Sequence, residues 1–119
     1  MTVLLFERNL LWSVRLRNAF AALGHEARTG NEAAPADLAV VNLSEGDRVA
    51  EVIAGLKELG VPILAHAGHK EKELMRLGKE LGVERLATNG QLASDLPDLL
   101  QRMGFPHNLP VIEPVSDQN

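Results

Sequence analysis

The sequence predicts an α/β domain with a five-stranded parallel sheet and helices on both of its faces. Five short apolar runs are separated by segments in which apolar residues recur with helical spacing. Glycines follow the helical segments, where a left-handed C-terminal residue is favoured, at Gly24, Gly60, Gly82 and Gly104. Strands that alternate with helices through short connections form parallel sheets with right-handed crossovers. These three observations define the predicted fold class.

The first strand and the first helix are well marked. Residues 3–6 (Val-Leu-Leu-Phe) form a continuous apolar run, which is typical of a strand buried on both faces. Asn9 is a suitable N-cap for the helix that follows. We expect this helix over residues 10–23, with an apolar stripe made of Leu16, Phe20 and Leu23.

The second strand is only weakly indicated, over residues 25–28, whereas residues 38–41 (Leu-Ala-Val-Val) strongly predict a third strand. Residues 29–36 between them are too few for a full helix, and they include Gly30 and Pro35. We therefore predict an extended crossover or a single turn. Such a crossover covers less of one sheet face, and apolar residues exposed there would favour dimerisation or docking of the C-terminal segment.

The second half of the chain repeats the alternation of helix and strand. We expect these elements at residues 47–59 (helix), 62–65 (strand), 70–81 (a charged helix) and 83–87 (strand). Proline is tolerated in the first turn of a helix but not in its interior. Because of Pro97, the last helix is expected to begin near Ser94 or Asp95 and to run to Met103.

After Gly104 the alternation stops. Pro106, Pro110 and Pro114 exclude a regular helix and fit an extended segment. We therefore divide the chain into a domain of residues 1–104 and a tail of residues 105–119. The tail is expected either to lie on its own domain or to be partly disordered, or else to dock on a second copy or a partner through its apolar residues, Phe105, Leu109, Val111 and Ile112.

Composition excludes several classes of function. The 119 residues, 45% of them apolar, suffice for one domain with its own core. The absence of cysteine excludes disulfides and thiolate metal sites and fits a cytoplasmic location. The formal net charge is −4 and the basic residues are scattered, so no surface for nucleic acid is expected. No apolar run reaches the ~20 residues of a membrane span, and the first residues predict a strand rather than a signal peptide.

In a parallel sheet, ligands and reactive groups lie at the carboxyl ends of the strands. There the chain resembles the receiver domains of bacterial response regulators, over about residues 3–103. The segments that carry the resemblance are the first strand with its polar end (3–11), the third strand (35–43), the fourth strand and its loop (60–69) and the fifth strand (82–90). The resemblance implies a CheY-like, or flavodoxin-like, sheet with strand order 2-1-3-4-5.

Position by position, the residues that receivers use for phosphorylation are replaced. Receivers hold Mg²⁺ with two acidic residues after the first strand, and here Glu7 is followed by Arg8. Their acceptor aspartate corresponds to Asn42, whose amide cannot form an acyl phosphate and is a weak ligand for Mg²⁺. The switch hydroxyl corresponds to Ala67 and the lysine to Asn89. The resemblance therefore implies a pseudo-receiver, with no enzymatic activity, metal or cofactor.

The charges at this edge of the sheet lead to the same expectation. Glu7 is the one acidic residue among those expected to point inward, and Arg8 is expected to neutralise it from the adjacent position. The positive charge of Arg8 would then take the place of the metal cation. The domain would stay permanently in one conformational state and would not switch. We expect an adaptor in cytoplasmic signalling that binds a protein partner or forms a homodimer.

Four residues are candidates for such an interface: Trp12, Met75, Leu86 and Phe105. Trp12 lies off the main stripe of its helix, so it either anchors a partner or packs against the loop after the fifth strand. The charged helix around Met75 is either a solvated face or, by the resemblance, part of a partner-binding and dimer surface.

A second hypothesis assigns the same edge to a small ligand or a minor enzymatic activity, using Glu7, Arg8, Asn42, His66 and His69. His66 and His69 are expected at a strand end and in a loop, where their spacing fixes no metal geometry, so we expect no metal. Ser44, His66 and Asp37 do not predict a hydrolase, because Ser44 lacks a nucleophile elbow and Asp37 lies at the opposite strand end. No glycine-rich phosphate loop follows the first strand, so a nucleotide cofactor is not expected.

Overall fold

The computed structural model describes residues 1–105, and it confirms the predicted five-stranded parallel sheet. The strand order is β2-β1-β3-β4-β5, and every neighbouring pair is parallel. The strands are β1 (Thr2–Phe6), β2 (Glu26–Thr29), β3 (Leu38–Asn42), β4 (Ile63–Ala67) and β5 (Arg85–Thr88). The predicted order 2-1-3-4-5 is therefore correct.

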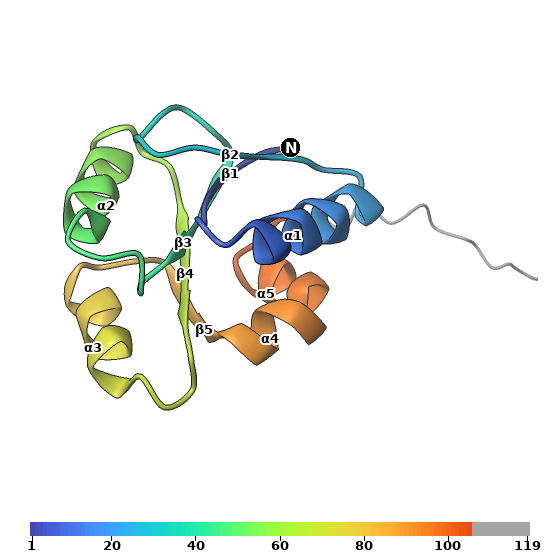
Figure 1. The fold of residues 1–119 in the computed structure, drawn as a ribbon. Helices are drawn as coiled ribbons and strands as arrows, with labels where there is room; N and C mark the ends of the chain where they lie inside the picture. Colours follow the sequence, from blue (N-terminus) through green and yellow to red (C-terminus); the bar gives the residue numbers. More distant parts are fainter. Residues whose placement is uncertain (106–119) are drawn as a thin grey trace, which may run out of the picture.

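Helices cover both faces of the sheet (Figure 1). They are α1 (Leu10–Ala22), α2 (Val49–Glu58), α3 (Lys72–Glu80), α4 (Asn89–Ser94) and α5 (Leu96–Arg102). The helices α2 and α3 lie on one face, and α1, α4 and α5 lie on the other. The chain therefore has the three-layer arrangement that strands alternating with helices predict.

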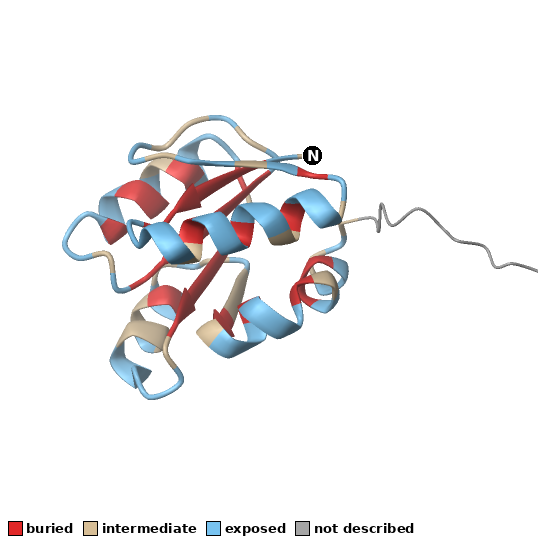
Figure 2. Ribbon diagram, turned by 45° about the vertical axis from the view of Figure 1, so that its right-hand side comes forward, coloured by how far each residue is buried: buried red, intermediate tan, exposed pale blue. Residues whose placement is uncertain are grey.

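Alternation along each strand divides the core into two clusters, because successive side chains point to opposite faces of a sheet. In β1, Leu4 and Phe6 pack with α2, while Val3 and Leu5 pack with α1, α4 and α5. The central strands β3 and β4 are buried at every position, as their continuous apolar runs predict. Figure 2 shows these buried strands between helices whose outer sides are exposed.

The crossover between β2 and β3 contains no helix, as predicted. It passes over the sheet at Gly30, where an added Cβ would lie 2.9 Å from Leu4 Cδ1. Three alanines of the crossover, Ala33, Ala34 and Ala36, then pack in part against the cluster under α2. The crossover therefore covers part of the face that a helix would otherwise cover, and a hollow remains beside α2.

The prediction for the end of the domain was incomplete. The helix α5 does begin at Leu96 with Pro97 in its first turn, but a separate helix, α4, precedes it. Thr88 and Gln91 form a capping box that starts α4, and Leu92 is fully buried beneath it. The pair Asn89-Gly90 is typical of a turn, and this local signal concealed the helix.

The tail assignment lies almost wholly outside the described residues, including the docking role predicted for Leu109, Val111 and Ile112. Phe105 itself is described: it packs in part against the cluster beneath α1 and α5, and its N–H donates to the Leu100 carbonyl. Within residues 1–105, no helix combines the length and the apolar character that crossing a membrane requires.

Candidate functional site

The carboxyl ends of β1, β3, β4 and β5 bring together Glu7, Asn42, His66 and Asn89, as the parallel topology predicts. We call these four side chains the rim cluster. Glu7 follows β1, Asn42 ends β3, His66 lies in β4, and Asn89 is the first residue of α4 after β5. Glu7 is only 7% exposed, Asn42 is buried and His66 is fully buried. Three of the four side chains of the rim cluster are therefore in the protein interior, and Asn89 is partly buried at its edge.

Amide groups hold the Glu7 carboxylate. The Asn42 side-chain Nδ2 donates to both oxygens, at 3.0 Å to Oε1 and 3.1 Å to Oε2. The backbone N–H of Asn9 donates to Oε2 at 3.2 Å. The Asn42 Oδ1 in turn accepts from the Ser44 hydroxyl at 2.7 Å and from the Ser44 N–H at 3.0 Å. Both polar atoms of the Asn42 amide are thus occupied by neighbours within the site.

His66 connects this arrangement to the fifth strand. Its Nδ1 lies 2.7 Å from Asn89 Oδ1, and its Nε2 lies 3.7 Å from Glu7 Oε1. The Nε2 atom is buried and has no hydrogen-bond partner among the described residues. A buried polar atom without a partner is rare in folded proteins and costs free energy. His66 is therefore the one incompletely satisfied member of the rim cluster.

Burial dominates the electrostatics of this pair. It raises the pKa of Glu7 above the ordinary 4.5, while hydrogen bonds from Asn9 and Asn42 partly offset that rise. Burial lowers the pKa of His66 below the ordinary 6.5, and the hydrogen bond with Asn89 partly offsets that fall. The nearby charge of Glu45 raises both pKa values. The site thus disfavours charge on either partner.

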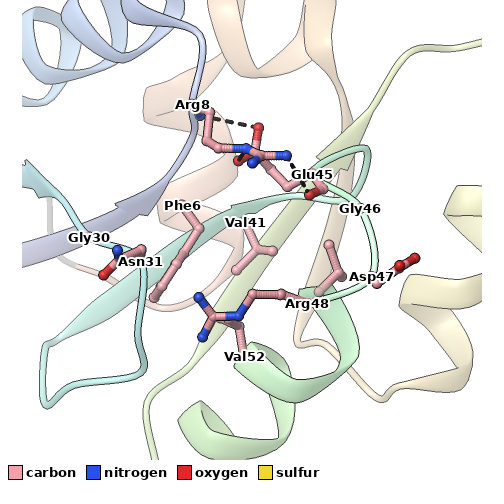
Figure 3. Close-up of a pocket in the computed structure, with 11 residues that line it drawn as sticks. Phe6, Arg8, Gly30, Asn31, Val41, Glu45, Gly46, Asp47, Arg48 and Val52 are labelled. Atoms are coloured by element: carbon pink, nitrogen blue, oxygen red, sulfur yellow. Dashed lines mark hydrogen bonds and ion pairs between the residues drawn. The ribbon is translucent and has the colours of Figure 1, made fainter.

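Arg8 does not neutralise Glu7, contrary to our expectation. Its side chain is 80% exposed and pairs with Glu45, with 3.1 Å between Arg8 Nε and Glu45 Oε1. The Arg8 N–H donates to Glu45 Oε2, and its Nη2 donates to the Glu45 carbonyl, both at 3.1 Å (Figure 3). A guanidinium is costly to bury, so it pairs with a carboxylate at the surface while amides hold Glu7. Sequence reasoning missed this role of Glu45, although an acidic residue shortly after β3 was a usable signal.

The remaining predicted site residues do not assemble into another centre. Ala67 is fully buried at the end of β4, and His69 is exposed in the following loop, apart from His66. Asp37 accepts hydrogen bonds from the Thr2 N–H and hydroxyl at the opposite end of the sheet, so no triad with Ser44 exists. Residues 1–105 contain no group of three or more His, Cys, Asp or Glu that could hold a metal.

The four candidate interface residues are each partly buried against the core. Met75 and Leu86 pack against the cluster under α2 and α3, and Trp12 and Phe105 pack against the opposite cluster. The Arg15 guanidinium lies 5.4 Å from the centre of the Trp12 ring, within the range of a cation–π contact. These side chains therefore have contacts within the domain, and whether they also form an interface stays a prediction.

Within residues 1–105, the two most exposed large apolar residues are at the start of α1. Leu10 and Leu11 are 79% and 84% exposed, and Val14 lies one turn further along the same helix. We call these three residues the α1 patch. These residues lie outside the buried stripe of Leu16 and Phe20. Their position off that stripe is the sequence feature from which their exposure could have been predicted.

A cavity of about 570 Å³ lies where the crossover leaves the sheet uncovered (Figure 3). Apolar side chains from β1, β3 and α2 form part of its wall, namely Phe6, Val41, Val49 and Val52. Arg8, Glu45, Asp47 and Arg48 line it as well. Its volume lies within the ~300–1,000 Å³ that small-molecule sites occupy. Of the rim residues predicted for a ligand, only Arg8 lines this cavity.

Comparison with known proteins identifies the architecture. No protein-family model and no curated protein matches the sequence. Among solved structures, a CheY-like protein (TadZ) from Pseudomonas aeruginosa has 18% identity and a TM-score of 0.72, over 87% of this chain and 99% of that one. A response regulator receiver protein from Burkholderia phymatum has 12% identity and a TM-score of 0.75, over 89% and 97%.

This chain has the receiver fold. A CheY-like response regulator protein from Mesorhizobium loti agrees, with 14% identity, a TM-score of 0.66, and 86% and 97% of the two chains covered. At such identities the likeness concerns the fold. In this receiver fold, the rim cluster lies at the carboxyl edge of the sheet, and no helix lies between β2 and β3.

Proposed function

We propose that this domain is a receiver-like protein-interaction module that cannot be phosphorylated and that acts in bacterial cytoplasmic signalling. The observation that carries the proposal is the state of Asn42 at the end of β3. This position has an amide in place of a carboxylate, and both amide atoms are engaged, by Glu7 and by Ser44. A phosphoryl acceptor needs an accessible carboxylate oxygen, and Asn42 offers none.

Two further positions support the proposal. Ala67, at the end of β4, has no hydroxyl that could follow a bound phosphoryl group. Asn89, which takes the position of the receiver lysine in the resemblance, carries no positive charge and contacts His66 instead. The phosphoryl acceptor, the switch hydroxyl and the positive charge of the lysine would thus all be missing. Regulation through this edge of the sheet would then depend on the binding of a partner and not on phosphorylation.

Treatment with acetyl phosphate, or with beryllofluoride and Mg²⁺, tests the missing phosphorylation. We expect no mass increase and no shift of the backbone resonances around Asn42 and Ala67. Asn42→Asp is the matched variant, because it restores a carboxylate at the same place with almost no change in size. A covalent adduct on the unchanged protein would contradict the proposal.

The binding role is tested separately, by light scattering over a range of concentrations and by a native pull-down. The α1 patch provides the variant, since Leu11→Ser changes an exposed side chain and should leave the fold intact. We expect either a concentration-dependent mass or a specific retained protein, and a weaker effect in Leu11→Ser. A strictly monomeric protein that retains nothing would count against the interaction module.

A second candidate function is the binding of a small molecule. The cavity beside Arg8 favours it, because its volume and its mixture of apolar and charged walls suit a small polar metabolite. A thermal-shift screen of metabolites tests this candidate. A hit should be weakened by Arg48→Glu, which changes an exposed wall residue, and left unchanged by Arg102→Glu on the distant helix α5. No hit, or equal binding by both variants, would argue against this cavity.

A further inference from the structure

The proposed function leaves one feature of the rim cluster unexplained, which is a buried carboxylate facing an unpartnered ring nitrogen. Glu7 Oε1 and His66 Nε2 are 3.7 Å apart, and neither side chain is appreciably exposed. The distance is slightly beyond a hydrogen bond, and both atoms have lone pairs. Without a proton between them, two acceptors face each other inside the protein.

The hydrogen bond on the other side of the ring determines which nitrogen carries the ring proton. Asn89 presents its carbonyl oxygen, Oδ1, to His66 Nδ1 at 2.7 Å. A carbonyl oxygen only accepts, so in this orientation of the Asn89 amide Nδ1 donates and carries the ring proton. A neutral imidazole has only one ring proton, so the Nε2 of neutral His66 has none. Any proton between the two side chains is therefore an additional one.

We propose that Glu7 and His66 bind one additional proton between them, and that this proton is linked to the orientation of the Asn89 amide. With the proton bound, either the carboxyl group of Glu7 donates to Nε2 or a charged His66 donates to the Glu7 carboxylate. In both arrangements Nδ1 remains a donor to Asn89 Oδ1, as the structure has it. This inference does not depend on the proposed binding role.

Loss of the proton leaves a carboxylate that requires a donor. The neutral imidazole can supply one by moving its single ring proton from Nδ1 to Nε2, which then donates to Glu7. Nδ1 becomes an acceptor, and the Asn89 amide must rotate to present its NH₂ group. One proton leaves the site, one changes nitrogen, and no other atom is exchanged.

Few charges surround the pair. The charge of Glu45, in the loop after β3, acts on both Glu7 and His66. The Glu45 carboxylate itself forms an ion pair with Arg8, in the loop after β1. In contact with the pair, β3 contributes the neutral Asn42, and the junction of β5 and α4 contributes the neutral Asn89. Within residues 1–105, Glu45 is thus the titratable residue that should change the affinity for this proton, and burial raises the pKa of Glu7 in the direction that favours uptake.

The consequence reaches the surface through α4. Asn89 is the first residue of that helix and is only partly buried. When the proton leaves, rotation of this amide turns its NH₂ group toward His66 and its carbonyl away from it, at the edge of the sheet beside the exposed Gly90. The domain would then present different hydrogen-bonding groups at two proton occupancies without a change of fold.

Nuclear magnetic resonance of the full chain tests the proposal, with ¹⁵N in histidine and ¹³C in the glutamate carboxyl group. On raising the pH, we expect the Glu7 carboxyl carbon, the His66 ring nitrogens and the Asn89 NH₂ signals to change with one shared midpoint. The His66 proton should move from Nδ1 to Nε2 over the same transition. Separate midpoints for Glu7 and His66 would overturn the proposal, as would Asn89 NH₂ signals that do not change over the transition.

Two variants complete the experiment. In Glu7→Gln the amide can donate to Nε2 permanently, so His66 should stay in the Nδ1–H form and lose the shared transition. Glu45→Gln is the control: it should keep the shared transition and only displace its midpoint to lower pH. If Glu7→Gln does not fold, Asn89→Ala takes its place, and Glu7 and His66 should then titrate with an altered midpoint. A His66 titration identical in the unchanged protein and in the variant at Glu7 or Asn89 would refute the linkage.

Discussion

The Glu7 carboxylate lies at the carboxyl edge of the sheet. Its oxygens accept hydrogen bonds from the Asn42 side chain and from the Asn9 N–H. Charge-assisted bonds of this kind stabilise the ion, but burial destabilises it more, so the pKa of Glu7 is raised. At the level of single residues, burial therefore favours the protonated form of Glu7, and the hydrogen bonds oppose it only in part.

Glu7→Gln should change how stability depends on pH. Because the folded pKa of Glu7 is above 4.5, its contribution to stability is fully present below that pH and is lost as the pH rises through the folded pKa. Gln cannot ionise, so the variant should gain stability relative to the unchanged protein as the pH rises to neutrality. Urea unfolding at several pH values measures this, with Glu45→Gln as the control. A stability difference that does not vary with pH would contradict the raised pKa.

Arg8→Ala should cost less than about 1 kcal/mol, because the pair with Glu45 is solvent-exposed on the arginine side. The pH dependence of unfolding should keep its shape, with only a small displacement of its midpoint through Glu45, since Arg8 does not contact Glu7. Denaturant unfolding at low and at high salt measures both effects. A marked change in the titration of Glu7 would instead favour the arrangement that we expected from the sequence.

The difference between Glu7 and Arg8 shows what residue order can and cannot predict. The positions of Glu7, Asn42, His66 and Asn89 at one edge followed from the parallel topology. The partner of Arg8 did not, because adjacency along the chain does not determine the side to which a side chain points. That choice depends on solvation and on a partner, Glu45, which is distant in sequence.

At the scale of single elements, α4 and α3 show how local signals compete. The start of α4 carries both a turn signal, Asn89-Gly90, and a capping box, Thr88 with Gln91. Burial of Leu92 favours the helix, and only the tertiary structure supplies that burial.

The helix α3 packs against the sheet at Gly78, its one buried residue, where an added Cβ would lie 2.6 Å from Leu86 Cδ2.

Thr88→Ala should destabilise the domain by about 1 kcal/mol, the usual effect of losing an N-cap side chain. The loss should be greatest in α4, since Thr88 Oγ1 accepts from the Gln91 N–H at 3.1 Å. Hydrogen exchange of the α4 amides measures it. Ser94→Ala, at the other end of the same helix, serves as the control and should leave the exchange at Gln91 unchanged. Equal protection of α4 in both variants would argue against the cap.

At the scale of the whole molecule, most of the fold was predictable because it depends on pattern rather than on particular contacts. Continuous apolar runs predicted the buried strands, and the apolar stripes predicted which side of the helices α1 and α2 is buried. The shape of the cavity beside α2 was not predictable, because it depends on how closely the alanines of the crossover pack against the sheet.

Leu64→Ala should destabilise the domain by roughly 2–5 kcal/mol, because Leu64 is fully buried in the central strand β4. Leu11→Ala, in the α1 patch, should change stability by less than about 0.5 kcal/mol. Thermal and urea unfolding of both variants measure the contrast. A similar loss in the two would mean that the α1 patch is packed rather than exposed.

The position of β2 at one edge of the sheet has a consequence for aggregation. An edge strand offers unpaired backbone groups to other chains, and charged side chains discourage such pairing. The strand β2 exposes Glu26 and Arg28, while β5 at the opposite edge includes Arg85. Continuation of the sheet from one molecule to the next is therefore disfavoured at either edge. Self-association, where it occurs, should therefore use helix surfaces and not extension of the sheet.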